Sequence, residues 1–582
     1  MFRSVYLLRV TGKGVLATLL FGAWSAVQAF PGIQNDWQSR YRGISASADN
    51  AGCQLCHANA NGGSPWNGYG WDLLLAKEDG SGCDLNIDGT VSNEEAFFCV
   101  EINDSDRNVV DNLTEIAASA QPGWIPGPNN SYFSRSGETT GHNPPDGIGL
   151  LDPDGTEPPP PVLPPPSTDD ENIPPGQKKR HTIVVRPGQS IQAAIDKARP
   201  GTRIYVLAGT YKEVGNSTNG LNISKSGISL IGQETKKKRV ILENAGNQRN
   251  GIVVVPPDRT DCMSCHTDLK PPFELAPGVD PGAMHPEPVI YGFEIRNITI
   301  KGFNNNGLFT ERVKGFNIVN VHSVDNPNYG IFPTLSSDGV ITHSSAVGSD
   351  DSGIWVETSE NVRVSHNLVA DNVNGFEISN SDDITLSHNE AYGNTVGIAS
   401  LLLPDIFDNR AGAKRLTFSN NYIHDNNRPN TARPGSILGT VPAGIGILHL
   451  GVDDSLMTGN RIENNNFFGI VIADYCVVVA GSSFSCDPND GPNFDPSITP
   501  EFIADQAATN NRVIGNVVIN NGLDPDVTHP FIFASSDLSL VTDYPYFTEM
   551  SGLTNCYADN EYYTSFSFFP LIGLPFVLPP CE

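Results

Sequence analysis

The 582-residue sequence predicts a mainly β fold, in which residues 179–582 coil as a solenoid of short parallel strands behind a small helical module. The first observation is a repeat, because pairs of Asn five residues apart recur and several are followed by Gly and an apolar residue. The pairs are Asn367/Asn372, Asn389/Asn394, Asn421/Asn426, Asn460/Asn465 and Asn516/Asn521. The second is the spacing of 22 residues from Asn367 to Asn389, which suits one coil of three short strands.

A ladder of Asn side chains is expected inside this solenoid. Stacked coils lie about 4.8 Å apart, so an inward Asn that recurs once per coil would bond the Asn above and below it. The third observation is alternation of apolar residues, which would line the core at positions such as Ile354, Val356, Val362 and Val364.

The start of the repeat tract carries a cap. Residues 183–195 predict a strand followed by a short helix that begins at Ser190, and Pro200-Gly201 turns into a second strand over 204–207. This segment resembles the opening of right-handed parallel β-helix proteins, where a short amphipathic helix covers the end that stacked repeats leave open. The resemblance implies a right-handed parallel β-helix over 179–582, interrupted at 256–288 and at 475–509.

Composition restricts the partners and the compartment. A formal net charge of -29 argues against nucleic acid and anionic lipid as partners. Residues 1–29 have the features of a signal peptide, with a basic start, an apolar run over 15–24 and a small-residue exit before Phe30. No later stretch is apolar enough for a membrane span, so we expect a periplasmic, secreted or cell-surface protein of bacterial origin.

Two copies of Cys-x-x-Cys-His stand at Cys53, Cys56 and His57 and at Cys262, Cys265 and His266. Two thiols at this spacing can add to the vinyl groups of one haem, and the adjacent His becomes an axial iron ligand. The alternatives are a disulfide, a redox dithiol or half of a zinc site, which would need further ligands. The repetition favours two covalently bound haem c groups, the second within the interruption at 256–288.

The segment from Asp84 to Glu95 matches an EF-hand calcium loop. Asp84, Asn86 and Asp88 supply side-chain oxygens, Thr90 its carbonyl, and Glu95 closes the site with two oxygens. The alternative is an Asx-rich turn that leads into a helix. Cys83 and Cys99 bracket the loop and are expected to form a disulfide.

The module over residues 30–155 resembles small bacterial c-type cytochrome modules in the order of its motifs. The haem motif is followed by Asn67-Gly68-Tyr69-Gly70, a helix over 71–77 and the loop that ends in Asn93-Glu94-Glu95. The resemblance implies electron transfer to a redox partner protein, with Cys53, Cys56 and His57 as haem ligands. The sixth iron ligand of the first haem is either His142 or absent or weakly bound. For the haem of the second motif, His285 is preferred to Met284 as the distal ligand.

Residues 156–178 form a Pro-rich linker. Beyond it, Cys476 with Cys486 and Cys556 with Cys581 are expected to form disulfides. We expect one column of histidines on three successive coils, formed by His343, His366 and His388. This column is either a stacked, half-exposed surface ladder or a site that binds a metal, an anionic sugar or the edge of a haem.

Two functions follow from these motifs. The first is an exported di-haem electron-transfer protein whose β-helix is a scaffold, docking surface or glycan-binding platform. The alternative is a carbohydrate-active β-helix enzyme, a polysaccharide lyase or epimerase, with an accessory cytochrome module. Asp350-Asp351 lacks the companion motifs of polygalacturonases and is predicted to be a turn.

Overall fold

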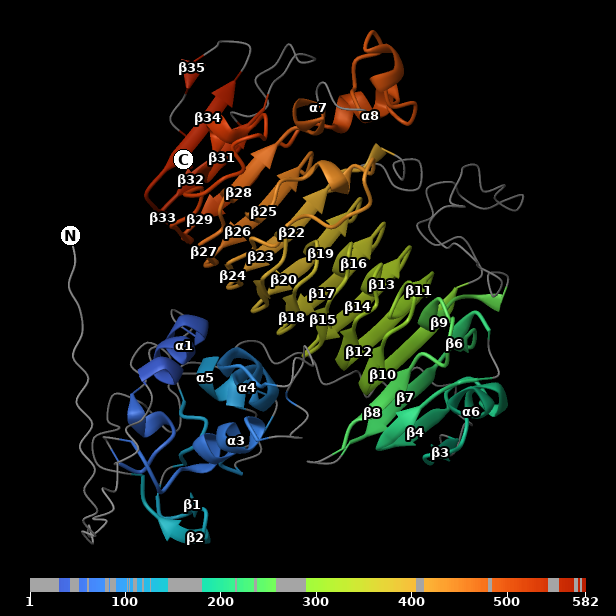
Figure 1. Ribbon diagram of the computed structural model, residues 1–582, viewed down its shortest axis with the longest axis vertical. Coiled ribbons are helices and arrows are strands. Elements are labelled where there is room, and N and C mark those ends of the chain that lie inside the picture. The colour runs from blue at the N-terminus through green and yellow to red at the C-terminus, as the bar shows by residue number, and fades with distance from the viewer. Residues whose placement is uncertain are drawn as a thin grey trace, which may run out of the picture.

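A computed structural model describes the chain in segments, which include the small N-terminal module and nearly all of the repeat tract (Figure 1). The described residues are 31–41, 52–59, 62–78, 83, 90–101, 103, 105–107, 112–117, 120–125, 127–144, 181–214, 217–234, 238–257, 289–404, 413–479, 484–542, 554–569, 574–575 and 578–581.

The N-terminal module consists of short helices and one antiparallel hairpin. Its elements are α1 (Pro31–Tyr41), η1 (Cys53–Leu55), α3 (Gly68–Ala76), α4 (Asn93–Val100), α5 (Asn112–Ala117), β1 (Asn130–Ser134) and β2 (Gly137–His142). Its small core includes Trp37, Tyr69 and Phe97. Helix α3 begins earlier than the predicted 71–77, because the Asn67 side chain accepts a hydrogen bond from Gly70 N and caps the helix there.

The repeat tract coils into columns of parallel strands (Figure 1). The first column contains β3 (Thr182–Val185), β4 (Arg203–Leu207), β7 (Ile228–Gln233), β10 (Ile290–Lys301), β12 (Val313–Val324), β14 (Ser337–Thr342), β17 (Glu360–Ser365), β20 (Thr385–Ser387), β23 (Thr417–Ser419), β26 (Leu456–Thr458), β29 (Arg512–Ile514) and β32 (Cys556–Ala558). Strands β10 and β12 bend through into the second column.

The second column adds β5 (Gly209–Tyr211), β8 (Val240–Glu243), β15 (Ser345–Val347), β18 (Leu368–Ala370), β21 (Glu390–Tyr392), β24 (Tyr422–His424), β27 (Arg461–Glu463), β30 (Val517–Ile519) and β33 (Glu561–Tyr562). The third contains β6 (Asn219–Ile223), β9 (Asn250–Val254), β11 (Leu308–Glu311), β13 (Tyr329–Thr334), β16 (Ser352–Glu357), β19 (Asn374–Ser379), β22 (Val396–Leu401), β25 (Ile445–Leu450), β28 (Phe468–Ala473), β31 (Ser536–Val541) and β34 (Ser565–Phe569), with β35 (Leu574–Pro575) antiparallel at its end. The prediction of a mainly β solenoid of parallel coils is therefore confirmed.

The predicted Asn ladder is confirmed, and it is double. One ladder joins Asn367, Asn389, Asn421, Asn460, Asn516 and Asn560 through side-chain amides at 2.9–3.0 Å. The other joins Asn372, Asn394, Asn426, Asn465 and Asn521 and ends on Asp537, over the same range of distances. Each buried amide therefore bonds the next coil, while the predicted core residues, Ile354 among them, are buried.

The capped end and the interruption at 475–509 agree with the sequence prediction, whereas residues 258–288 lie outside the described residues. Helix α6 (Ile191–Lys197) caps the first coils, and Ser190 accepts a hydrogen bond from Ala193 N as predicted. Three further short elements, η4 (Leu438–Thr440), η5 (Gly491–Asn493) and η6 (Ile532–Ala534), lie in loops with α7 (Tyr475–Val478) and α8 (Pro500–Asp505). The predicted disulfides Cys83–Cys99, Cys476–Cys486 and Cys556–Cys581 are present. None of the helices in the described ranges has the length and apolar character that crossing a bilayer requires.

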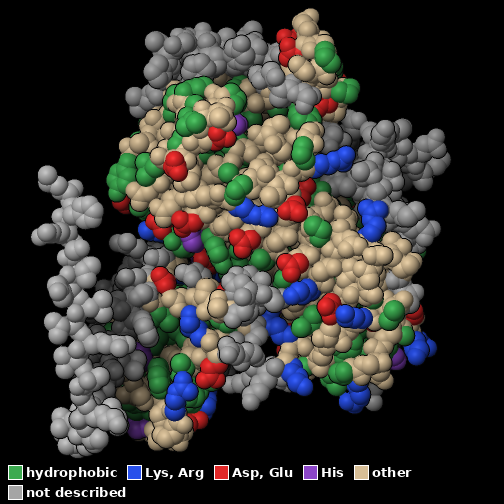
Figure 2. Space-filling view, in the orientation of Figure 1, with side chains coloured by type: hydrophobic (Ala, Val, Ile, Leu, Met, Phe, Trp, Pro, Cys, Tyr) green, Lys and Arg blue, Asp and Glu red, His purple; other side chains and the backbone are tan. Residues whose placement is uncertain are grey.

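The N-terminal module packs on the second column of strands. Phe98 of α4 is 4% exposed and packs with Leu368 and Ala370. Arg40 of α1 forms ion pairs with Glu101 of its own module, at 2.9 Å, and with Glu390 of β21. Beyond this contact, the face in Figure 2 shows acidic and basic side chains interspersed. A buried aromatic ring and a bridging guanidinium therefore join the two parts.

Phe98→Asp is expected to release the module from the β-helix, because a carboxylate would be buried among apolar side chains without a partner. Small-angle X-ray scattering should show a larger radius of gyration while circular dichroism retains the β signal. Val214→Asp, at a side chain 82% exposed, is the matched control. An unchanged radius in Phe98→Asp would contradict this interface.

Candidate functional site

The first Cys-x-x-Cys-His motif forms one tight turn. Cys53 begins the 3-10 turn η1, and His57 N donates to Cys53 O at 3.0 Å. Both Cys53 and Cys56 are free and half-buried. The structure therefore contains two unpaired thiols at this motif and not the alternative disulfide.

The His57 ring is oriented by the backbone. Its Nδ1 lies 2.8 Å from the carbonyl oxygen of Gly63, so Nδ1 carries the proton and donates to that oxygen. This tautomer leaves Nε2 with a lone pair for an iron ion. Burial lowers the pKa of His57, so the imidazole is neutral at pH 7, as a metal ligand must be.

The Asn67–Gly70 motif holds this turn in place. Asn67 is fully buried, donates from Nδ2 to Leu55 O at 2.7 Å, and caps α3 with its Oδ1. A Cβ at Gly70 would lie 2.1 Å from Cys56 O, so only Gly allows α3 to approach the turn this closely. Helix α3 therefore packs directly against the turn that carries the motif.

Asn67→Ala is expected to destabilise the module by about 2–3 kcal/mol, because it removes a helix cap and leaves the buried Leu55 carbonyl without its donor. Urea unfolding followed by near-ultraviolet circular dichroism would measure the loss. Asn59→Ala, at an exposed position in the neighbouring loop, is the control. Equal unfolding midpoints for the two variants would refute the anchoring role.

The Cys56 thiol is protonated at pH 7. Burial and the neighbouring Cys53 raise its pKa to about 12. A redox dithiol therefore stays an alternative to haem attachment for this motif.

Aromatic side chains surround the motif. The His57 ring lies 6.0 Å from Trp66, which lies 5.8 Å from Trp71, and Trp71 stacks on Phe133 at 5.8 Å. His142, the predicted sixth ligand, instead stacks on Tyr132 at 3.9 Å, with its Nε2 2.9 Å from Thr139 Oγ1. To reach an iron, His142 would have to leave both contacts.

The other predicted ligands are described in part. Cys262, Cys265, His266 and His285 lie outside the described residues, as do Asp84, Asn86 and Asp88. Of the predicted calcium ligands, Thr90 is exposed, and Glu95 forms a capping box with Ser92 at the start of α4. In this structure the Glu95 carboxylate caps the start of α4, and calcium binding at this segment stays a prediction.

The predicted histidine column is present. His343, His366 and His388 stack in parallel, with ring centroids 5.2 and 5.1 Å apart. Burial lowers the pKa of His366 well below its ordinary value and also lowers that of His388. The neutral rings of His366 and His388 offer no positive charge to an anionic sugar, so these two residues fit a packed ladder better than a binding site.

A pair of carboxyl groups from neighbouring coils meets on the outer face of the third column. Ser352 Oγ lies 3.1 Å from Asp351 Oδ1 and 2.5 Å from Glu377 Oε2. Glu377 also accepts from Asn374 Nδ2 and from Ser379 Oγ, both at 2.9 Å. Asp351 does stand in the predicted turn before β16, but burial and Glu377 raise its pKa well above the ordinary value.

Sequence reasoning missed Glu377. It follows the repeated Asn-Gly-apolar signature as Asn374-Gly375-Phe376-Glu377, at an outward position of a strand that is buried throughout. The sequence did offer one signal for Glu377, since it is the single charged residue in a strand whose other residues are apolar or uncharged. Its partnership with Asp351 could not be read from the sequence, because the contact crosses from one coil to the next.

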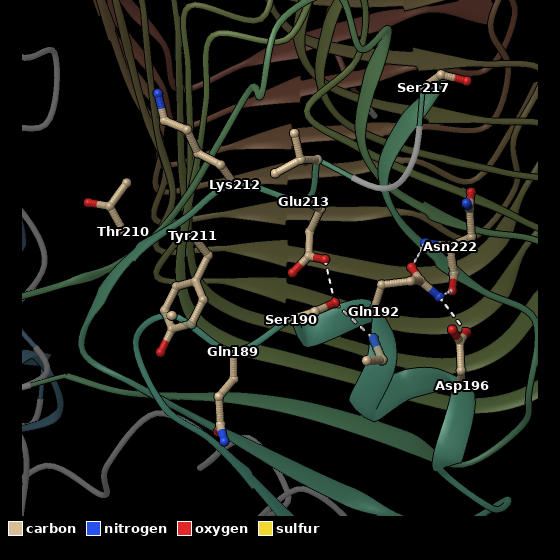
Figure 3. Close-up of a pocket in the computed structure, with 13 residues that line it drawn as sticks. Gln189, Ser190, Gln192, Asp196, Thr210, Tyr211, Lys212, Glu213, Ser217 and Asn222 are labelled. Atoms are coloured by element: carbon tan, nitrogen blue, oxygen red, sulfur yellow. Dashed lines mark hydrogen bonds between the residues drawn. The ribbon is translucent and has the colours of Figure 1, made fainter.

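A separate groove of 760 Å³ lies at the capped end (Figure 3). Figure 3 shows Glu213 pointing to Ser190, whose hydroxyl donates to it at 2.7 Å, while Ile191 N donates to the same carboxylate at 2.6 Å. Gln192 is held by Asp196. These groups cap α6, so the groove is part of the end cap. Within the described residues no three His, Cys, Asp or Glu side chains are gathered so as to hold a metal ion.

Comparisons with known proteins concern the repeat tract. Residues 290–402 match the family model described as right handed beta helix region. The chain is similar to the mannuronan C-5 epimerase A-module of Azotobacter vinelandii, with 16% identity, 65% of this chain and 94% of that one covered, and a TM-score of 0.37. It is also similar to the DFA-IIIase of Arthrobacter chlorophenolicus A6, with 11% identity, 69% and 91% covered, and a TM-score of 0.38.

A third similar structure is the family 28 exopolygalacturonase of Yersinia enterocolitica, with 12% identity, 67% and 77% covered, and a TM-score of 0.31. No curated protein matches the chain by sequence. The columns of parallel strands and the match over residues 290–402 together identify a right-handed parallel β-helix in this chain.

Proposed function

We propose that this protein is an exported c-type haem protein that transfers electrons. The observation that carries the proposal is the geometry of the first motif: two free thiols on one turn, followed by an imidazole whose Nδ1 donates to Gly63 O and whose Nε2 is left for iron. Cys53 and Cys56 would hold the haem covalently, and His57 would be its axial ligand.

Covalently bound haem supplies one-electron chemistry, and the protein's part is to bind and orient it. The Gly63 carbonyl sets the tautomer and direction of His57, and Asn67 keeps the turn against α3. His142 remains a candidate sixth ligand, as His285 does for a second haem on Cys262, Cys265 and His266. Calcium at Asp84, Asn86, Asp88, Thr90 and Glu95 would clip the loop before α4.

The formal net charge of -29 suits a cationic redox partner in the periplasm or at the cell surface. The test of the haem proposal is a pyridine-haemochrome assay with intact mass on protein from a host that matures cytochromes c. Covalent haem on each chain is the expected result. Complete absence of haem would overturn the proposal.

The second candidate function is that of a carbohydrate-active enzyme whose active site lies on the β-helix. The Asp351–Glu377 pair favours this function. Paired carboxyl groups with different protonation are the acid/base equipment that glycan chemistry uses. Isothermal titration calorimetry with alginate and polygalacturonate would test for a glycan ligand. This candidate concerns the β-helix and is compatible with haem on the N-terminal module.

A further inference from the structure

The protonation of the carboxyl pair follows from its hydrogen bonds. A hydroxyl carries one proton, so Ser352 Oγ cannot donate to Asp351 and Glu377 at the same time. Glu377 accepts two other donors, Asn374 Nδ2 and Ser379 Oγ, which favours its ionised form. The hydroxyl proton therefore goes to Glu377 Oε2, the nearer of the two oxygens, and burial together with Glu377 raises the pKa of Asp351, which favours a proton on that carboxyl group.

The two groups differ in access as well as in charge. Glu377 is 5% exposed, whereas Asp351 is half-buried at the turn that leads into β16. Ser379 is fixed in turn by Trp355, whose Nε1 donates to it at 3.0 Å. The more accessible Asp351 thus lies beside a buried carboxylate that its hydrogen bonds orient.

A polar atom next to this pair points to a ligand. The Oδ1 of Asn374 has no hydrogen-bond partner among the described residues, although Asn374 is only 1% exposed. Its amide nitrogen bonds Glu377, and its backbone pairs with Ser352, so the atom belongs to the same cluster. A buried acceptor without a donor is costly, and a sugar hydroxyl would supply the donor.

We propose that Asp351 and Glu377 are the acid and the nucleophile of a glycoside-hydrolysing site, an inference that rests on the second candidate function. Two bonds through one hydroxyl, of 3.1 Å and 2.5 Å, keep the two carboxyl oxygens close together. Such closeness matches retaining glycosidases, whose carboxyl groups lie about 5–5.5 Å apart, and is too short for the inverting class at about 6.5–9.5 Å.

The reaction balances with water as the only co-reactant. Asp351 gives its proton to the glycosidic oxygen while the bond from that oxygen to the anomeric carbon breaks, and Glu377 forms an ester to that carbon. A water molecule then loses a proton to Asp351 and cleaves the ester, which releases the sugar and restores both groups. Burial, Asp351 and Glu377 raise the pKa of the neighbouring Tyr329, so this phenol keeps its proton at pH 7 and does not take part in the two steps.

The experiment incubates the full chain with a panel of 4-methylumbelliferyl glycosides, alginate and polygalacturonate, and measures released fluorophore, new reducing ends and unsaturated uronate. We expect reducing ends or fluorophore without unsaturated product. Asp351→Asn should lower the rate by about 10³-fold because it removes the proton donor, and Glu377→Gln should lower it at least as much because it removes the nucleophile. Asp350→Asn changes the adjacent exposed carboxylate and should retain the rate of the unmodified protein. Circular dichroism confirms that each variant is folded.

Each other outcome overturns the assignment. Cleavage that survives in Glu377→Gln would assign the chemistry elsewhere, and unsaturated product would establish a lyase. Binding of a polysaccharide without cleavage would reject hydrolysis but leave the glycan function standing. Neither binding nor cleavage of any probe would reject both.

Discussion

Replacing both Cys53 and Cys56 by Ser is expected to remove one covalently bound haem from every chain, an all-or-none effect. Serine oxygens do not form the thioether bonds that hold haem c, so the loss does not depend on affinity. Intact mass would show the change, and the pyridine-haemochrome assay would show one haem fewer per chain. A remaining haem would then report on the motif at Cys262, Cys265 and His266.

His57→Ala should retain the thiols but alter the absorption spectrum of the reduced protein, because the axial ligand on Nε2 is lost. His181→Ala, at an exposed histidine that precedes β3, is the matched control and should leave the spectrum unchanged. An unaltered haem count in the double Cys variant would show that the first motif does not bind haem.

Asn394→Ala is expected to lower the free energy of unfolding of the β-helix by about 3–5 kcal/mol. Asn394 Oδ1 accepts from Asn372 N at 2.9 Å and from Asn372 Nδ2 at 3.0 Å, and its own Nδ2 donates to Asn426 Oδ1. Alanine would remove the side-chain acceptor of the buried Asn372 N and one of the two acceptors of Asn372 Nδ2, and it would interrupt the ladder. Urea unfolding monitored at the β signal in circular dichroism would measure the loss.

Asn304→Ala is the control for the ladder, because Asn304 is exposed and its backbone alone is bonded to the neighbouring coil. Its free energy of unfolding should change by no more than about 0.5 kcal/mol, as is usual for surface substitutions. Equal midpoints for Asn304→Ala and Asn394→Ala would show that the buried amides contribute no net stability.

The sequence by itself determined the elements that repeat or act locally. The Asn pairs, the apolar alternation and the Ser190 cap are short-range patterns, and each fixes a conformation with neighbours a few residues away or one coil away. The three disulfides could be paired from proximity along the chain, since their partners lie within 25 residues of each other. The turn at Cys53, Cys56 and His57 could likewise be read from the fixed spacing of two thiols and an imidazole, and the haem on it stays a prediction.

The tertiary structure alone decided which distant groups meet. Phe98 packs against Leu368, and Arg40 reaches Glu390, through contacts that no local pattern encodes. Asp351 and Glu377 are brought together because parallel coils align residues about one turn apart, and the exact register depends on the turns between strands. The sequence names the chemical groups, but their protonation and partners follow from burial and hydrogen bonds, which exist only once the coils are stacked.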